Sequence, residues 1–232
     1  MQDDRVALIS GANRGLGLAM AKVLYDQGWR LALGMREPAL PDWADPQRVA
    51  VHAYDARQLT AAEPWVAATL ARFGRVDGVI ANAGIMVPHN VIDVSEDDLE
   101  AMLDINVKAP RRLAKAAWTA LSASGRGRVI IIGSLSGKRV KSASAGSYSV
   151  SKFAAVALAH ALRHQGWEAG IRATAVCPGF VATDMALALS SRDPALMTQA
   201  EDIGRAVALL LDLPNEASVA EFAINCQLEE SY

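Results

Sequence analysis

Short apolar segments alternate along this chain with longer segments in which apolar residues recur at helical spacing. The apolar segments are almost continuously hydrophobic, and they lie at residues 6–10, 31–35, 49–54, 76–82, 129–134, 171–177 and 221–226. Continuous hydrophobicity is typical of strands that are covered on both faces, as in a parallel sheet. The pattern therefore predicts about seven buried parallel strands.

The segments between these strands have the spacing of helices, at residues 16–27, 60–73, 98–122, 148–165 and 200–211. Pro110 lies inside the third helix and predicts a kink there, because proline lacks a backbone N–H. Strand and helix alternate to the end of the chain, which predicts an α/β fold with a doubly wound parallel sheet. No linker divides the chain, so we expect one domain over residues 1–232. The stretch 37–46 reads as an ordered surface loop, and the long connection 184–198 is typical of a lid.

Composition and charge exclude several classes of protein. The 232 residues carry 23 Lys and Arg against 25 Asp and Glu, and 52% of them are hydrophobic. This balance gives no global electrostatic reason to bind nucleic acid or an anionic membrane, and it excludes global disorder. No apolar run approaches the ~20 residues of a membrane span, and the acidic start of the chain is unlike a secretory signal. The two cysteines, Cys177 and Cys226, form no disulfide framework. We therefore expect a cytoplasmic protein.

A glycine-rich turn follows the first predicted strand and leads directly into the first helix. Its glycines are Gly11, Gly15 and Gly17. Such a turn lets the backbone approach a phosphate, and the helix N-terminus supplies free N–H groups and a positive dipole end. The alternative is a tight turn whose glycines serve packing only.

A second candidate site combines a phenol, an ammonium and a hydroxyl. Tyr148 and Lys152 lie four residues apart at the start of a predicted helix, so they share one face. A nearby ammonium favours the phenolate, which predicts a pKa for Tyr148 below its usual ~10. Ser134 ends a predicted strand and points into the crevice where open α/β sheets bind ligands. The three groups together suit proton exchange with a substrate oxygen, although an exposed Tyr and Lys at a helix start is the alternative.

At this point the sequence resembles the short-chain dehydrogenase/reductase family in its compact single-domain form. The resemblance runs from about Arg5 to Cys226 and rests on four motifs in family order. These are Ser10-Gly11-x-x-x-Gly15-x-Gly17, Asn82-Ala83-Gly84, Tyr148-x-x-x-Lys152 and Pro178-Gly179-x-x-x-Thr183. The resemblance implies a Rossmann-like sheet with strand order 3-2-1-4-5-6-7.

The resemblance also implies roles for individual residues. Tyr148 would be the general acid in carbonyl reduction and the general base in alcohol oxidation. Lys152 would hold the nicotinamide ribose and tune Tyr148, and Ser134 would orient the substrate oxygen, with Ser136 as a second candidate serine. Asn106 would help to hold a water near Lys152. Val181 and Thr183 would fix the nicotinamide carboxamide, and Asp55 would read the adenine amino group. The full set expected against the cofactor is Gly11, Asn13, Arg14, Gly15, Leu16, Gly17, Arg36, Asp55, Ala56, Asn82, Ala83, Gly84, Tyr148, Lys152, Pro178, Gly179, Val181 and Thr183.

The sequence departs from the family pattern at three places. Gly133 precedes Ser134 where the family usually has a second serine, Ala81 replaces the first Asn of its NNAG motif, and the C-terminal segment lacks the family's frequent Gly-Gly. The last departure puts the form of a C-terminal interface in doubt rather than the chemistry.

Charge near the second strand favours NADP(H) over NAD(H). NAD-binding proteins usually have an acid at the end of this strand, whereas here Met35 is followed by Arg36. Arg14 in the glycine-rich turn is a second guanidinium that suits a 2′-phosphate. NAD(H) stays possible because Glu37 could reach a ribose hydroxyl, and both arginines could be solvated surface charges.

The expected function is an NADP(H)-dependent oxidoreductase that reduces a small ketone or aldehyde reversibly. The alternatives are an NAD-dependent alcohol or polyol dehydrogenase and a non-catalytic dinucleotide-binding sensor on the same fold. The apolar residues of the lid suit a substrate with apolar bulk, or else pack on the protein itself. We expect a homodimer or homotetramer that pairs helices 98–122 and 148–165, and no metal, nucleic-acid or membrane partner.

Overall fold

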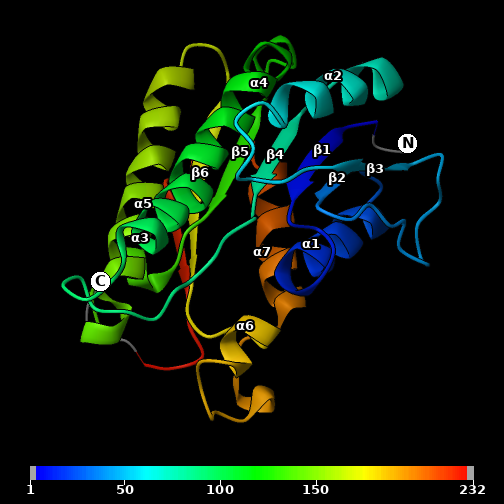
Figure 1. Cartoon of the computed structure of the whole chain (residues 1–232). Helices are drawn as coiled ribbons and strands as arrows, with labels where there is room; N and C mark the ends of the chain where they lie inside the picture. The colour runs from blue at the N-terminus through cyan, green and yellow to red at the C-terminus, as the bar shows by residue number, and fades with distance from the viewer. Residues whose placement is uncertain (1–3, 229–232) are drawn as a thin grey trace.

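A seven-stranded parallel sheet forms the centre of the molecule. A computed structural model describes residues 4–228 of the chain. The strands are β1 (Val6–Ser10), β2 (Arg30–Met35), β3 (Val49–Ala53), β4 (Gly78–Ala81), β5 (Arg128–Ile132), β6 (Arg172–Pro178) and β7 (Glu221–Ile224). They are ordered β3-β2-β1-β4-β5-β6-β7, and every neighbouring pair is parallel (Figure 1). The predicted fold class and strand order are confirmed.

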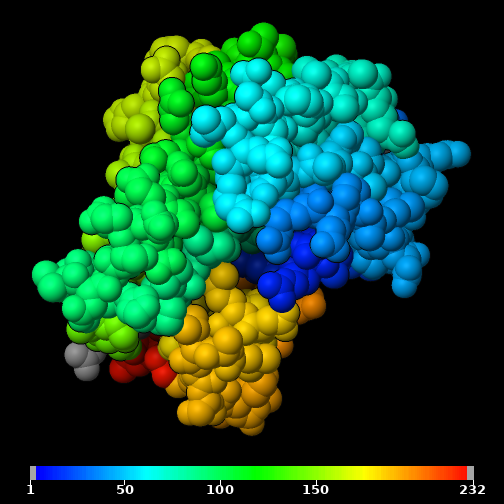
Figure 2. Space-filling model, viewed as in Figure 1, coloured from blue at the N-terminus to red at the C-terminus, as the bar shows by residue number. Residues whose placement is uncertain are grey.

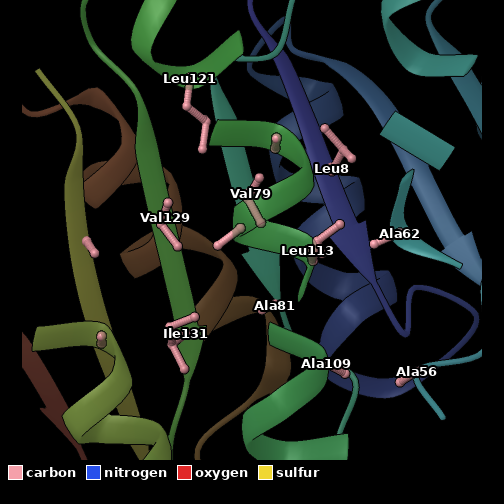
Figure 3. Close-up of a cluster of buried hydrophobic side chains, with 14 of the residues drawn as sticks. Leu8, Ala56, Ala62, Val79, Ala81, Ala109, Leu113, Leu121, Val129 and Ile131 are labelled. Atoms are coloured by element: carbon pink, nitrogen blue, oxygen red, sulfur yellow. The ribbon is translucent and has the colours of Figure 1, made fainter. Parts of the chain in front are cut away.

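Helices cover both faces of this sheet. Helices α2 (Ala62–Phe73), α4 (Ala109–Ala123) and α5 (Gly146–Gly166) pack on one face, and α1 (Gly15–Asp26) and α7 (Ala200–Asp212) pack on the other. Successive strand residues point to opposite faces, so Leu8 joins the first layer while Ala7 and Ile9 join the second. Figure 3 shows the first layer, in which Leu113 of α4 covers the face of the sheet that carries Leu8, Val79 and Val129. Each fully buried Val, Leu or Ile contributes about 1.5–3 kcal/mol.

The third predicted helix is divided by a wider turn. It starts as α3 (Glu96–Leu103), which Ser95 caps by accepting a hydrogen bond from the backbone N–H of Asp98 (3.1 Å). A π-helical turn at Asp104–Lys108 follows, and α4 begins immediately after it. The kink expected near Pro110 takes the form of this π-helical turn. Pro110 has no N–H to donate to the carbonyl of Asn106, so the regular α-helical pattern is interrupted there.

The expected lid contains two short helical turns, α6 (Asp184–Leu187) and a 3₁₀ turn at Pro194–Leu196. Its base is closed by a parallel bridge between Val181 and Thr198. Four apolar lid side chains are exposed, namely Met185, Leu187, Leu189 and Leu196. The lid lies beyond the carboxyl ends of the strands, in gold at the bottom of Figure 1.

The sheet changes its winding direction between β1 and β4. Strand β1 pairs with β2 on one side and with β4 on the other, although about seventy residues separate Ile9 from Ile80. The chain connections leave these two strands in opposite directions, which opens a crevice at their carboxyl ends. Figure 2 shows a hollow at this place, between the dark-blue glycine-rich turn, the green chain and the gold lid. Within residues 4–228, no helix is long and apolar enough to cross a bilayer.

Candidate active site

The glycine-rich turn has the geometry of an anion-binding loop. Gly11 and Gly15 adopt left-handed backbone conformations, with φ of 67° and 52°. Gly17 is required for a different reason, because a Cβ there would lie 2.2 Å from the carbonyl oxygen of Gly11. Helix α1 begins at Gly15, and no side chain caps its N-terminus. Its first backbone N–H groups therefore suit an anionic ligand such as a pyrophosphate.

Asn82 and Ser10 tie the turn to β4. The Asn82 amide donates to the carbonyl oxygens of Ser10 (3.0 Å) and Gly11 (3.1 Å), while the Ser10 hydroxyl accepts from the backbone N–H groups of Asn82 (3.0 Å) and Ala83 (3.1 Å). The side chain of Asn82 is thus engaged in holding the two strand ends together. Ala83 and Gly84 continue along the crevice with their backbone.

The segment after β6 closes the crevice against the same turn. It follows Pro178 and Gly179, and the Thr183 hydroxyl donates to the carbonyl of Val181 (3.3 Å). The Thr183 methyl lies 3.5 Å from where a Cβ on Gly15 would be. The first and the last cofactor motifs of the sequence are therefore adjacent in space. Of the other expected residues, Asn13 is exposed and Leu16 is half-buried at the start of α1.

Ser134, Tyr148 and Lys152 come together, as the sequence predicted. Ser134 follows β5, and its hydroxyl oxygen accepts the backbone N–H of Ser136 (3.0 Å). Tyr148, in the first turn of α5, forms a hydrogen bond with Ser134 rather than with Ser136, the other candidate serine. Lys152 lies one turn later, with Nζ 5.7 Å from the centre of the Tyr148 ring. The Lys152 ammonium donates to the carbonyl of Ile132 (2.9 Å).

Burial controls the titration of this pair, which corrects one expectation. Burial raises the pKa of Tyr148 to about 12, and the hydrogen bond to Ser134 offsets only part of that. Burial also lowers the pKa of Lys152 to about 8. The predicted lowering of the Tyr148 pKa by Lys152 is wrong, because desolvation is the largest influence on the phenol and raises its pKa. At neutral pH the phenol keeps its proton.

Asn106 is buried beside Lys152, in the π-helical turn. Its amide is fully engaged, since Oδ1 accepts from the N–H of Ile85 (2.9 Å) and Nδ2 donates to the Ile85 carbonyl (2.9 Å) and to Ser151 (3.0 Å). A Cβ on Gly84 would lie 3.2 Å from Oδ1 of Asn106 and 3.6 Å from Nζ of Lys152. The Asn106 side chain is thus fully engaged within the protein, and Pro110 cannot donate an α-helical hydrogen bond to the Asn106 main-chain carbonyl.

Cys177 lies directly behind the catalytic candidates, and sequence reasoning gave it no role there. Its buried thiol accepts the backbone N–H of Ser134, and it is close enough to influence the pKa of Tyr148 and of Lys152. A Cβ on Gly133 would come within 3.1 Å of the Cys177 sulfur. Strands β5 and β6 pair Ile132 with Val176, so the register places Gly133 beside Cys177. Only this register could have revealed the contact.

Three arginines follow the carboxyl ends of the first three strands, one after each strand. Arg14 forms an exposed ion pair with Asp184 at the start of the lid (2.9 Å). Arg36 is exposed directly after β2. Asp55, after β3, pairs with Arg57 (2.8 Å), a residue that the sequence analysis did not select. The carbonyl of the neighbouring Ala56 accepts a hydrogen bond from Arg112 (2.7 Å).

The described residues contain no group of three His, Cys, Asp or Glu side chains that could hold a metal ion. His160 instead lies 2.6 Å from Glu221.

Comparisons with known proteins agree on one family. The sequence model of a family described as short chain dehydrogenase matches residues 5–194. A protein named agropine synthesis reductase, from Rhizobium rhizogenes, is 37% identical over 97% of this chain and 53% of its own length. The chain thus spans about half the length of that relative. Oxidoreductase UcpA of Salmonella typhimurium is 32% identical over 78% of this chain and 71% of its own.

A solved structure has the same architecture. The alcohol dehydrogenase of the archaeon Thermococcus sibiricus, complexed with 5-hydroxy-NADP, superposes with a TM-score of 0.84 at 27% identity. The match covers 97% of this chain and 99% of that one.

Proposed function

Because this chain belongs to the short-chain dehydrogenase family, we propose that it is an oxidoreductase that uses NADPH to reduce a small ketone or aldehyde to an alcohol. The observation that carries the proposal is the half-buried Tyr148 phenol, protonated at neutral pH and hydrogen-bonded to Ser134 in the crevice. A group that holds its proton until an oxygen becomes more basic suits a general acid in reduction.

In this proposal Ser134, Tyr148 and Lys152 have different roles at the substrate oxygen. The nicotinamide cofactor supplies the hydride when it is bound. The Ser134 hydroxyl donates a hydrogen bond to the carbonyl oxygen and orients it, and Tyr148 transfers its proton to that oxygen as negative charge develops there. Lys152 holds its ammonium beside the Tyr148 ring, where it stabilises the phenolate that remains. In alcohol oxidation the same groups act in reverse.

Three observations support NADPH rather than NADH. Strand β2 ends at Met35, where an NAD-binding protein usually has an acid, and the exposed Arg36 follows it. Arg14, in the glycine-rich turn, is also exposed. Guanidinium groups bind phosphate oxygens through two parallel hydrogen bonds. The similar alcohol dehydrogenase was solved with an NADP derivative. Glu37 next to Arg36 is a local feature that opposes this preference.

The substrate we propose has an apolar portion. Leu187, Leu189 and Leu196 of the lid are exposed at the carboxyl edge of the sheet, where they could cover such a group. The name of the agropine synthesis reductase supports reduction as the direction.

Titration with NADPH and, separately, NADH in a thermal unfolding assay tests the cofactor. A ligand at 100 times its Kd stabilises the fold by about 2.7 kcal/mol. We expect stabilisation by NADPH at lower concentrations than by NADH. Stabilisation by NADH alone would overturn the cofactor preference, and no stabilisation by either would remove the proposed activity.

Tyr148→Phe tests the acid. The variant should lose turnover of a carbonyl panel by at least about a hundredfold, while its affinity for NADPH stays within about twofold, because the ring and Lys152 remain. Substantial residual turnover would exclude Tyr148 from the proton transfer.

A further inference from the structure

Asp55 and Arg57 form a tightly bound local pair at the adenosine end of the crevice. The backbone N–H of Arg57 donates to Asp55 Oδ1 (3.0 Å), its Nε donates to the same oxygen (3.2 Å), and its Nη2 donates to Oδ2 (2.8 Å). The Arg57 side chain is 63% exposed, whereas that of Asp55 is 21% exposed. One turn of chain thus holds the carboxylate and its partner in a fixed arrangement.

A second guanidinium acts on the same carboxylate. The pKa of Asp55 is lowered chiefly by the hydrogen bond from Arg57 and, to a smaller extent, by the charge of Arg36. Arg36 is therefore within electrostatic range of Asp55. Across residues 4–228, however, Arg36 has no hydrogen-bonded or ion-paired partner, and its side chain is exposed. Arg57, and not Arg36, makes the side-chain hydrogen bonds to the Asp55 carboxylate.

We propose that Arg57 is a positioning residue for cofactor selection: it neutralises Asp55 and so leaves Arg36 available to bind a 2′-phosphate. This inference rests on the proposed NADPH dependence. Together Asp55, Arg36 and Arg57 carry a net charge of +1. Without Arg57 the two remaining charges cancel, and the carboxylate both repels a phosphate and attracts Arg36. Arg57 would thus act through Arg36 without touching the phosphate.

Binding measurements on five variants test this inference. Kd values for NADPH and NADH would be measured by quenching of tryptophan fluorescence for Arg57→Gln, Arg57→Lys, Arg36→Gln, the Arg36→Gln/Arg57→Gln double variant and Arg205→Gln. The last is the matched control, because Arg205 is equally exposed (67%) and pairs with a nearby acid, Asp202, on α7. Circular dichroism would verify that each variant is folded.

We expect Arg57→Gln to reduce the preference for NADPH over NADH about fivefold at low ionic strength, and less at high salt. In the Arg36→Gln background the same substitution should have no further effect on the preference. Arg205→Gln should match the wild type, and Arg57→Lys should lie between the wild type and Arg57→Gln, because it keeps the charge without the two-point contact.

Three outcomes would overturn the inference. An unchanged preference in Arg57→Gln would remove Arg57 from selection, while a wild type that still prefers NADPH would leave the proposed function intact. Equal weakening of both cofactors would mean that Arg57 serves the adenine side only. Additive effects of the two substitutions would mean that Arg57 contacts the phosphate itself. A wild type that binds neither cofactor would instead be a failure of the proposed function.

Discussion

Tyr148 and Lys152 are shifted in opposite directions by the same cause. Lys152 is buried and Tyr148 is half-buried. Desolvation therefore favours the uncharged form of each, and the pKa values move to about 12 for Tyr148 and about 8 for Lys152. The proton affinities of the two residues therefore move apart, so that at neutral pH a protonated phenol lies beside an ammonium. A ligand that brings polar groups beside Lys152 would stabilise this ammonium further.

Lys152→Met should remove a pH dependence of stability. A lysine whose folded pKa is lowered binds fewer protons in the folded than in the unfolded state between about pH 8 and pH 10.5. The stability of the wild type should therefore rise with pH across this window relative to the variant, by up to about 1.4 kcal/mol per pH unit. Chemical denaturation of both proteins from pH 7 to pH 10 measures this difference. A difference that stays constant with pH would show that Lys152 titrates normally.

Gly133 and Cys177 should behave as a coupled pair. An alanine at 133 would press its Cβ against the Cys177 sulfur, so Gly133→Ala should cost about 1–3 kcal/mol of stability. In a Cys177→Ala background the same substitution should cost clearly less, because the sulfur is gone. A double-mutant cycle by urea unfolding measures the coupling. Additive costs would contradict the contact.

At the level of elements, the hydrophobic pattern was sufficient for every strand and for the five long helices. Continuous apolar runs and terminal glycines such as Gly74 mark these elements in the sequence itself. The π-helical turn at Asp104–Lys108 was missed, because Pro110 indicates an irregularity without specifying its kind. The turns within the lid were also missed, since a segment of this length has no periodic signal.

In the candidate site, too, the sequence predicts some contacts and not others. Local sequence motifs predicted that Ser134, Tyr148 and Lys152 lie close together, and the structure places them so. Each stands at the end of an element whose position the fold determines. Contacts between distant segments could not be predicted. The Arg14–Asp184 pair joins residues 170 positions apart, and the Cys177 contact depends on the register of two strands.

The pair Arg14–Asp184 links the glycine-rich turn to the lid and competes with a phosphate for Arg14. Asp184→Asn should therefore raise the affinity for NADPH about two- to fivefold and leave that for NADH unchanged, because the exposed pair is weak and only the phosphate gains a partner. Isothermal titration with both cofactors measures this. A loss of affinity for both would mean that the pair holds the lid in place for binding.

At the scale of the whole molecule, α5 presents an apolar stripe outward. Val150 and Phe153 are 50% and 43% exposed, and Ala157 and Ala161 continue the stripe along the helix. Such a face suits close packing against a second copy, which accords with the expected homo-oligomer.

Phe153→Asp should therefore lower the molar mass measured by light scattering after size-exclusion chromatography. The control is Leu59→Asp, which places the same charge at an apolar residue that is 72% exposed and lies outside α5. A wild type that is already monomeric, or an equal effect of both variants, would contradict assembly through α5.

The pairing of β1 with β4 also constrains how the protein is made. A hairpin cannot join parallel neighbours, so β1 cannot pair with β4 until about seventy further residues have been synthesised. The crevice is completed later still, because Thr183 closes it against Gly15. At ~5–20 residues per second, roughly ten to thirty seconds of synthesis separate Gly11 from Thr183. A nascent chain therefore has no dinucleotide to stabilise it while its strands are unpaired. Chaperones that shield apolar strands should matter most in that interval, and added cofactor should help only chains that have already been released.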